Sequence, residues 1–245
     1  MHKIWMMIVG LMLCSVAFGG VLPADCQQVI MGSSKNWDDS HAQLSLLEKR
    51  GNQWVMVKGP FSVRLGKSGL VWGLGLHPVI QGQKVKKEGD LRSPAGVFAL
   101  GGVYGTVSTP AKHWGLEYRR VTPNDLWVED YNSPAYNHHL VLNHPATTKW
   151  ELEQQMKLND YAHCLKVFIR HNAPGDVGRP IPKAGSSIFF HIWRRDGQSP
   201  TAGCTTMSEA NLRDLIKWLE PAKKPVYVLL PVTDYLRLRS PWGLP

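Results

Sequence analysis

The chain has 245 residues, of which 43% are hydrophobic and 19% charged, which excludes a disordered chain and allows a sizeable core in one large or two small domains. Its formal net charge of +9 suits an anionic partner, such as a nucleic acid, an acidic lipid or an acidic polymer. Lysine and arginine are scattered rather than interleaved with aromatic residues, so we expect no nucleic-acid partner.

The first 20 residues have the composition of a secretory signal. Lys3 precedes an uncharged apolar run from Ile4 to Phe18, and Ala17-Phe18-Gly19 resembles the small-x-small site of signal peptidase. The run is about 15 residues, shorter than the ~20 that span a bilayer, which favours cleavage over a retained membrane anchor. Lipoprotein processing at Cys14 is a further alternative, disfavoured by the bulky residue before it. We therefore expect a signal peptide over residues 1–20, export to the periplasm or cell envelope, and no stable membrane anchor after cleavage.

Short segments typical of strands follow along the rest of the chain. The segments Leu44 to Arg50 and Trp54 to Val57 flank Gly51-Asn52, which predicts a hairpin with its turn at that dipeptide. The other expected strands are Cys26 to Ile30, Phe61 to Leu65, Val97 to Val103, His139 to Asn143, Val167 to Arg170, Ser187 to Ile192 and Pro225 to Leu230.

Two helices are expected between these strands. Trp150 to Leu158 is rich in helix formers, and Ser208 to Leu219 places leucine and isoleucine at helical spacing behind Ser208, a good N-cap. Pro221 marks the end of the second helix. Many short strands with few helices predict a mostly β domain, sandwich-like or barrel-like, and we expect it to run as a single unit from residue 26 to residue 245.

The cysteines are Cys14, Cys26, Cys164 and Cys204, and Cys14 lies in the expected signal. An odd number of cysteines therefore remains in the exported protein, so at least one of them has no partner for a disulfide. We expect a disulfide between Cys26 and Cys164, because an oxidising compartment permits it, and this leaves Cys204 free. A free cysteine is often an inert buried thiol, so the local sequence must decide its role.

The segment from Phe189 to Met207 reads as a strand, a polar loop, Thr-Ala-Gly-Cys and a helix. A helix starting a few residues after Cys204 would lower the pKa of its thiol. The backbone N–H groups of Gly203 and Cys204 would hold an oxyanion, with His191 as the base across the loop. These are the parts of a cysteine acyl-transfer site, although the spacing alone also fits a structural histidine and an inert thiol.

Separate stretches of the chain resemble the YkuD-type L,D-transpeptidases. His191 with Thr201-Ala202-Gly203-Cys204-Thr205 resembles the family's His…(Ser/Thr)-x-Gly-Cys signature. The early segment Lys87 to Phe98 and the histidine-bearing strand Gly185 to His191 are also similar. The branch of the family with long inserts is indicated by Val128-Glu129-Asp130, Tyr136-Asn137 and Arg170-His171-Asn172.

Two positions depart from the family pattern. Ile192 follows His191 where many members have glycine, and Thr206 stands where many have an arginine that is thought to hold substrate. Arg194 and Arg195 are candidates to supply the missing positive charge to the substrate. The alternative is that both are solvated charges of the loop with no contact to the substrate. The other candidates for substrate contact are Trp193, Thr201 and His144. Thr201 and Ser187 are also candidates to orient the histidine.

The resemblance implies a β-sandwich catalytic domain that acts on peptidoglycan stem peptides without a metal or cofactor. His191 would take the proton of Cys204, and the thiolate would attack the carbonyl before the terminal D-alanine of a stem tetrapeptide. An amine would then resolve the acyl-enzyme into a crosslink or a protein–wall link. If water resolves the acyl-enzyme instead of an amine, the protein is an L,D-carboxypeptidase. A further alternative, from a different functional class, is a non-catalytic relative that binds the cell wall.

Two other arrangements of histidine and cysteine compete with this site. His138, His139 and His144 with Cys204 contain enough ligands for zinc, but their spacing fits a strand and not a helical pair. A papain-like protease would need its cysteine near the mature N-terminus and its histidine far downstream, whereas His191 here precedes Cys204.

Overall fold

The structure is a computed structural model that describes residues 20–107, 116–156 and 159–245. The expected signal peptide, apart from Gly20, lies outside the described residues, as does the end of the expected helix at residues 157–158. Across the described ranges, no helix is both long and apolar enough to cross a membrane.

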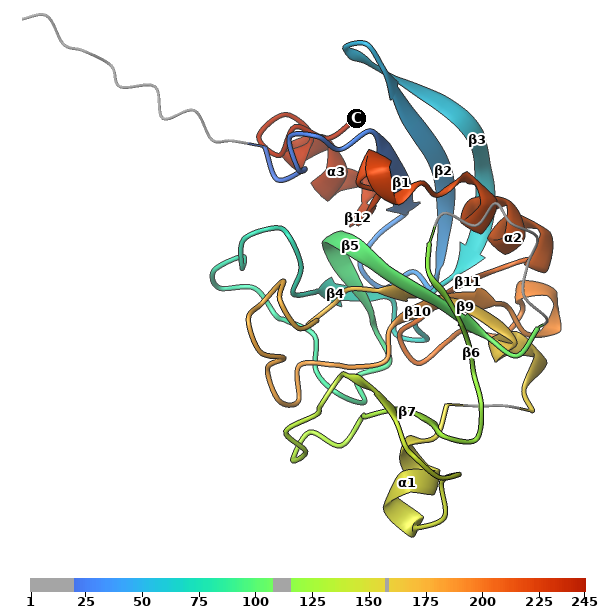
Figure 1. The fold of residues 1–245 in the computed structure, drawn as a ribbon. Helices are drawn as coiled ribbons and strands as arrows, with labels where there is room; N and C mark the ends of the chain where they lie inside the picture. Colours follow the sequence, from blue (N-terminus) through green and yellow to red (C-terminus); the bar gives the residue numbers. More distant parts are fainter. Residues whose placement is uncertain (1–19, 108–115, 157–158) are drawn as a thin grey trace, which may run out of the picture.

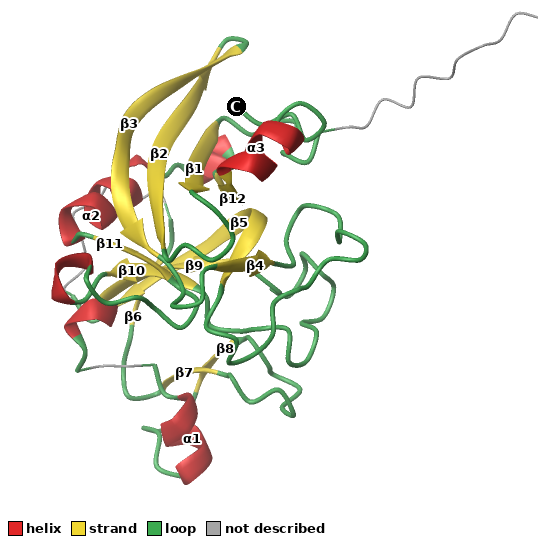
Figure 2. Cartoon of the chain, turned by 180° about the vertical axis from the view of Figure 1, so that it is seen from behind, coloured by secondary structure: helices red, strands yellow, loops and turns green. Residues whose placement is uncertain are grey.

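Short strands dominate the described chain, which confirms the expected mostly β fold (Figures 1 and 2). The strands are β1 (Gln28–Ser34), β2 (His41–Arg50), β3 (Gln53–Arg64), β4 (Leu70–Trp72), β5 (Ser93–Gly105), β6 (Tyr118–Arg120), β7 (Asp125–Trp127), β8 (His139–Val141), β9 (Leu165–Ile169), β10 (Phe189–Ile192), β11 (Thr205–Met207) and β12 (Val226–Pro231). The helices are α1 (Lys149–Gln154), α2 (Glu209–Trp218) and α3 (Val232–Leu238), with short 3₁₀ turns η1 (Tyr161–His163), η2 (Arg195–Gly197) and η3 (Pro221–Lys223).

The main sheet closes on itself. Its strands run in the order β12-β1-β2-β3-β11-β10-β9-β5-β4, and β12 also pairs with β5. The two layers of the expected sandwich are therefore continuous through hydrogen-bonded strands. The hairpin of β2 and β3 projects from this ring, and its turn lies at Gly51-Asn52 as expected (Figure 1).

The hydrophobic core fills the inside of the ring, because successive side chains of a strand point to opposite faces. Phe190 and Ile192 of β10 and Met207 of β11 are buried in this core, together with Leu212 and Leu215 of α2. The alternate side chains, Phe189 and His191 of β10 with Cys204 and Thr206, belong to the outer face. The same alternation thus builds the core and exposes a second face to other segments.

The long connection between β5 and β9 covers part of that outer face. It carries β6, which pairs with β5 in the main sheet, and then β7, β8 and α1, which lie below the main sheet (Figures 1 and 2). The ring of Trp127 packs 4.4 Å from that of Phe168 and 4.8 Å from that of Phe189, measured between ring centroids. These aromatic contacts form a smaller apolar cluster outside the ring of strands.

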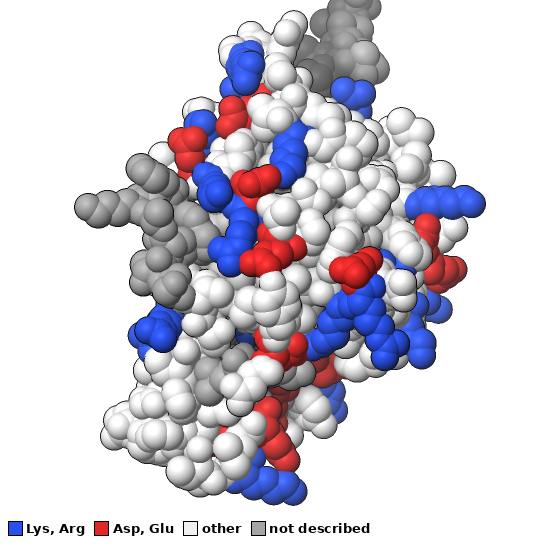
Figure 3. All heavy atoms as spheres, turned by 90° about the vertical axis from the view of Figure 1, so that its right-hand side faces the viewer, with Lys and Arg blue, Asp and Glu red and all other residues white. Residues whose placement is uncertain are grey.

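Charge is mixed on the face that carries α2. Figure 3 shows basic and acidic side chains lying next to one another there, and the ion pairs of this region include Lys58 with Asp214 and Arg213 with Glu209. The positive net charge is therefore not gathered into one basic patch on this face.

Ser208 caps α2 as expected, since its side chain accepts from the N–H of Asn211. Two elements differ from the expectation. Cys204 is followed by the short strand β11 rather than directly by the helix, and α3 was not foreseen. β11 has only three residues, which is too short for its alternation to be read from the sequence.

The expected disulfide between Cys26 and Cys164 is wrong, because both thiols are free. Cys26 lies just before β1 and donates to the carbonyl of Gln28, whereas Cys164 lies just before β9. The pairings β1–β12, β12–β5 and β5–β9 put three strand spacings between them, roughly 14 Å, while a disulfide needs α-carbons about 6 Å apart.

This arrangement predicts the thiol content of the folded protein. Alkylation after denaturation without reductant should label the three cysteines that the structure describes, Cys26, Cys164 and Cys204, and prior reduction should add no label to them. Intact-mass spectrometry measures the count. A gain of two labels after reduction would contradict the structure.

Candidate functional site

The pairing of β10 with β11 brings the candidate catalytic residues together. The two strands are parallel, with Phe190 opposite Thr205 and His191 opposite Thr206. Cys204, one residue before Thr205, therefore lies beside Phe189, whose N–H donates to Cys204 Sγ at 3.4 Å. Two residues along one strand and one strand across correspond to roughly 8 Å between the α-carbons of Cys204 and His191. Both side chains are on the outer face of the sheet, within reach of one substrate.

Thr201 and Ser93 fix the turn that presents Cys204. The Thr201 hydroxyl donates to the Cys204 carbonyl at 2.6 Å and accepts from the N–H of Gly203 at 3.0 Å. Ser93 also donates to the Cys204 carbonyl, at 3.3 Å. The early segment and the cysteine segment singled out in the sequence thus meet in space.

Gly203 permits this close approach. A Cβ at this position would lie 3.1 Å from the carbonyl oxygen of Arg92 and 3.1 Å from Ile188 Cδ1, with φ at +157°. The Gly203 N–H is already bonded to Thr201, so in this structure it is not available as the expected oxyanion donor. The residue shapes the turn instead.

The expectation of a lowered Cys204 pKa is wrong. Burial raises the pKa of the thiol, and the Phe189 N–H and the nearby Lys166 only partly oppose it. β11 lies between Cys204 and α2. The positive end of the helix is therefore too far from the thiol to lower its pKa, because the effect of a helix dipole is confined to about the first turn. Among the described residues the S–H donates to Ser187 O at 3.5 Å and makes no hydrogen bond to His191.

His191 is oriented by the chain next to it. Its Nδ1 lies 2.9 Å from the Ile192 carbonyl, which can only accept, so the proton is on Nδ1 and Nε2 is the basic nitrogen. The imidazole is buried and stacks on that of His163, with centroids 4.3 Å apart. Burial, and next the proximity of His163, lower the His191 pKa to about 3. His191 is therefore a neutral base at neutral pH, beside a neutral thiol.

The family of L,D-transpeptidase catalytic domains named YkuD matches residues 39–228. The chain belongs to the YkuD family. The chain is also similar to the solved structure of Bd1075 from Bdellovibrio bacteriovorus, at 12% identity and a TM-score of 0.41, over 89% of this chain and 55% of that one. The helical cell shape determining protein Pgp2 from Campylobacter jejuni is similar at 15% identity and a TM-score of 0.39, over 84% of this chain and 48% of that one. This chain thus spans about half the length of both. A search of curated proteins finds no match.

Most of the expected substrate-contact residues of this YkuD domain lie away from Cys204. Arg194 forms an ion pair with Asp160, and Arg195 is an exposed residue of η2. Trp193 packs against Gly197 within its own loop. His144 is on the loop before α1, with Nε2 3.7 Å from a carboxylate oxygen of Glu151. Only Thr201 contacts the Cys204 turn, as described above.

Two residues that the sequence did not single out cover His191. The imidazole of His163, in η1, stacks on that of His191, and its Nδ1 lies 2.8 Å from a carboxylate oxygen of Asp160. Asp160 also pairs with Arg194, so these three side chains form a small polar cap over the imidazole. The nearness of residues 160 and 163 to 191 follows from strand pairing and left no local signal in the sequence.

Asn137 joins the β5–β9 connection to the site. Its amide donates to the carbonyls of His171 and Asn172, and its carbonyl accepts from Trp127 Nε1 and the N–H of Ser187. Ser187 in turn accepts the Cys204 S–H. The conformation of the chain before β10 therefore depends on one fully bonded buried amide.

The three clustered histidines do not converge on a metal. His139 Nε2 bonds to Asp125 at 2.8 Å, His138 Nδ1 lies 2.8 Å from the Tyr136 carbonyl, and His144 is exposed. In the part of the chain that the structure describes, no group of three or more histidine, cysteine, aspartate or glutamate side chains is placed to hold a metal ion.

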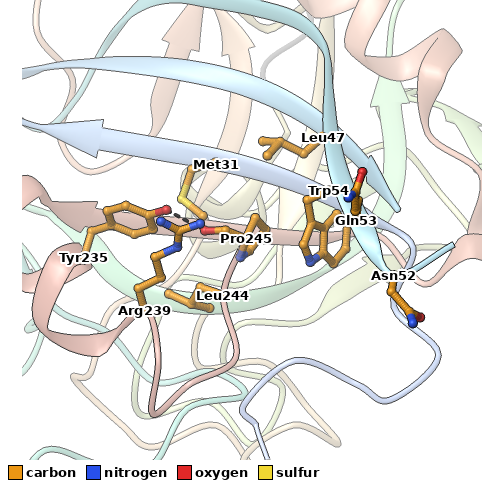
Figure 4. Close-up of a pocket in the computed structure, with 9 residues that line it drawn as sticks. All are labelled: Met31, Leu47, Asn52, Gln53, Trp54, Tyr235, Arg239, Leu244 and Pro245. Atoms are coloured by element: carbon orange, nitrogen blue, oxygen red, sulfur yellow. Dashed lines mark hydrogen bonds between the residues drawn. The ribbon is translucent and has the colours of Figure 1, made fainter. Parts of the chain in front are cut away.

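A hollow of about 520 Å³ opens elsewhere, between the β2–β3 hairpin, β1 and α3 (Figure 4). Trp54, Arg239 and Tyr235 line it, and Tyr235 donates to the Pro245 carbonyl at 2.5 Å. Neither Cys204 nor His191 lines this hollow. Its size alone does not make it the candidate functional site, which rests on the side chains of β10 and β11.

We expect Asn137→Ala to destabilise the domain by roughly 2–4 kcal/mol, because it leaves several buried backbone and side-chain groups unpaired. Urea denaturation measures this change. Gln83→Ala, at an exposed position, is the control and should change stability by less than about 0.5 kcal/mol. Equal effects of the two substitutions would contradict the structural role of Asn137.

Stability should fall as the pH drops below about 6.5, the pKa of histidine in an unfolded chain. Burial lowers the pKa of His163 to about 4 and those of His171 and His191 to about 3, so in this window the unfolded chain binds more protons than the folded one. Each histidine contributes a slope of up to about 1.4 kcal/mol per pH unit.

Denaturant unfolding at pH 7 and pH 5 tests this dependence. His163→Phe should reduce the loss between the two values, whereas His144→Gln, at an exposed position, should leave it unchanged. A loss as large in His163→Phe as in the wild type would show that His163 is not held neutral.

Proposed function

We propose that this YkuD-family domain is an exported peptidoglycan L,D-transpeptidase with Cys204 as nucleophile and His191 as general base. The observation that carries the proposal is the parallel register of β10 and β11, which presents the thiol and an Nδ1-anchored imidazole on one face. Membership of the family supports the substrate class, a peptidoglycan stem peptide. The signal-like composition of residues 1–20 supports export.

The reaction begins from the neutral pair. Nε2 of His191 takes the Cys204 proton as the sulfur attacks the carbonyl that precedes the terminal D-alanine. The Cys204 N–H stabilises the oxyanion in our proposal. The C–N bond then breaks, His191 returns its proton to the departing amine of D-alanine, and a thioester remains on Cys204.

An acceptor amine completes the cycle. It attacks the thioester and loses its proton to His191, so that a new amide bond forms in a crosslink or a protein–wall link as the C–S bond breaks. His191 then returns the proton to the Cys204 sulfur, which restores the neutral pair. Because burial keeps both groups neutral, the proton moves within the site during attack rather than before substrate binds. Water in place of the amine gives the carboxypeptidase outcome from the same thioester.

Incubation with a disaccharide tetrapeptide and mass analysis of the products tests the proposal. We expect loss of alanine together with a crosslinked dimer in the wild type. Cys204→Ala should abolish both, and His191→Gln should slow them by roughly 10²–10⁴-fold, the usual contribution of a general base.

Cys26→Ala is the matched control, since this other free cysteine lies before β1 and away from the site. It should retain wild-type turnover. Alanine loss without dimer at any acceptor concentration would identify a carboxypeptidase. Intact substrate with folded wild type would indicate the non-catalytic alternative.

A further inference from the structure

Two buried polar atoms lack a hydrogen-bond partner in the described part of the chain, Arg64 Nε and Thr206 Oγ1. Arg64 is 7% exposed and Thr206 is 1% exposed. They are also neighbours, because Arg64 at the end of β3 pairs with Thr206 of β11. Buried polar groups without partners are rare in folded proteins, so two on adjacent strands call for an explanation.

This pair adjoins the catalytic histidine. Thr206 lies between Arg64 on β3 and His191 on β10, so the three residues form one row across the sheet. Their neighbours along the strands, Val63 and Met207, belong to the core, which puts the row on the outer face with Cys204. The unpartnered atoms therefore lie on the face where the reaction takes place.

The chemistry of the pair indicates an anionic ligand. Arginine can only donate hydrogen bonds, and its guanidinium keeps its positive charge. Among the described residues, the guanidinium of Arg64 is hydrogen-bonded through Nη1 to Nε2 of the exposed His41 and forms no ion pair with a carboxylate. A carboxylate oxygen would accept from Nε of Arg64 and from the hydroxyl of Thr206 together.

We propose, on the basis of the function proposed above, that Arg64 and Thr206 bind the terminal carboxylate of the departing D-amino acid. The scissile carbonyl lies at Cys204 and the departing nitrogen at His191. The carboxylate carbon of an amino acid is about 2.5 Å from its own nitrogen. A nitrogen at His191 thus leaves its carboxylate beside Thr206, the next residue in the row, and within reach of Arg64.

Other cations near the site have different surroundings. Lys86 bonds to Asp90 at 2.5 Å, and Arg194 pairs with Asp160. Lys166 pairs with His191 from the opposite side, on β9, where its ammonium lies 4.8 Å from the Phe189 ring. Arg64 is therefore the cation on the Thr206 side of His191.

The loop between β10 and β11 is anchored beside this subsite. Its ends are fixed next to the pair, because Trp193 N–H donates to Met207 O at 2.9 Å and Thr201 N–H donates to Leu65 O at 2.9 Å. Between these bonds, Arg194 to Asp196 are exposed. The subsite makes the enzyme selective for a free C-terminal carboxylate.

The test compares a disaccharide tetrapeptide with the same compound as its C-terminal amide, which lacks the negative charge. The wild type should use the acid with a kcat/KM higher by roughly tenfold or more. Arg64→Gln keeps an N–H donor and removes the charge, so it should lose that preference by slowing the acid alone. Thr206→Val should reduce it in the same direction.

A charge-relocation variant makes the test independent of folding effects. Arg64→Gln combined with Thr206→Arg moves the guanidinium across the strand pair and should restore part of the preference. Lys58→Gln, also on β3, is the control and should leave the preference unchanged. Thermal unfolding of each variant establishes that the compared proteins are folded.

The outcomes separate the two proposals. A wild type that turns over both substrates equally, or an Arg64→Gln variant that slows both equally, would overturn the carboxylate subsite and leave the proposed function standing. The unpartnered atoms would then bind a structural water. A wild type inactive on both substrates would overturn the proposed function and the subsite with it.

Discussion

The parallel pairing of β10 and β11 is the interaction on which the rest of the site depends. Parallel neighbours cannot be joined by a tight turn, so a loop must carry the chain back before β11 begins. This requirement explains why Cys204 follows His191 by 13 positions. The register then fixes which side chains share a face, since a slip by one residue would turn Cys204 or His191 into the core. Ser93 and Thr201 hold the Cys204 carbonyl and so stabilise that register.

The environment of the site keeps the Cys204 thiol and the His191 imidazole uncharged. The aromatic cluster around Phe189 buries the sulfur, and the cap of His163 buries the imidazole. Burial disfavours both the thiolate and the imidazolium, so an ion pair does not form ahead of the reaction. The Ile192 carbonyl compensates by fixing the tautomer, which leaves Nε2 able to accept the proton. In the proposed mechanism, reactivity is thus tied to the presence of substrate.

Features with a local origin were predictable from the sequence. The turn at Gly51-Asn52, the N-cap Ser208 and the mostly β composition each depend on nearby residues, and the pattern around Cys204 indicated its family. Features set by strand pairing were not predictable. The distance between Cys26 and Cys164, the stacking of His163 on His191 and the strand inserted before α2 arise from tertiary neighbours. The lack of hydrogen-bond partners at Arg64 Nε and Thr206 Oγ1 likewise depends on tertiary neighbours and was not predictable.

Acylation of the folded protein by a carbapenem tests most directly whether Cys204 and His191 act together. The reagent needs both a nucleophilic sulfur and a base that removes its proton, and intact-mass spectrometry with peptide mapping locates the adduct. The account predicts a stable adduct on Cys204 in the wild type, much slower formation in His191→Gln, and none on Cys26 or Cys164. An unmodified Cys204 in the folded wild type, or an adduct that forms equally fast without His191, would contradict it.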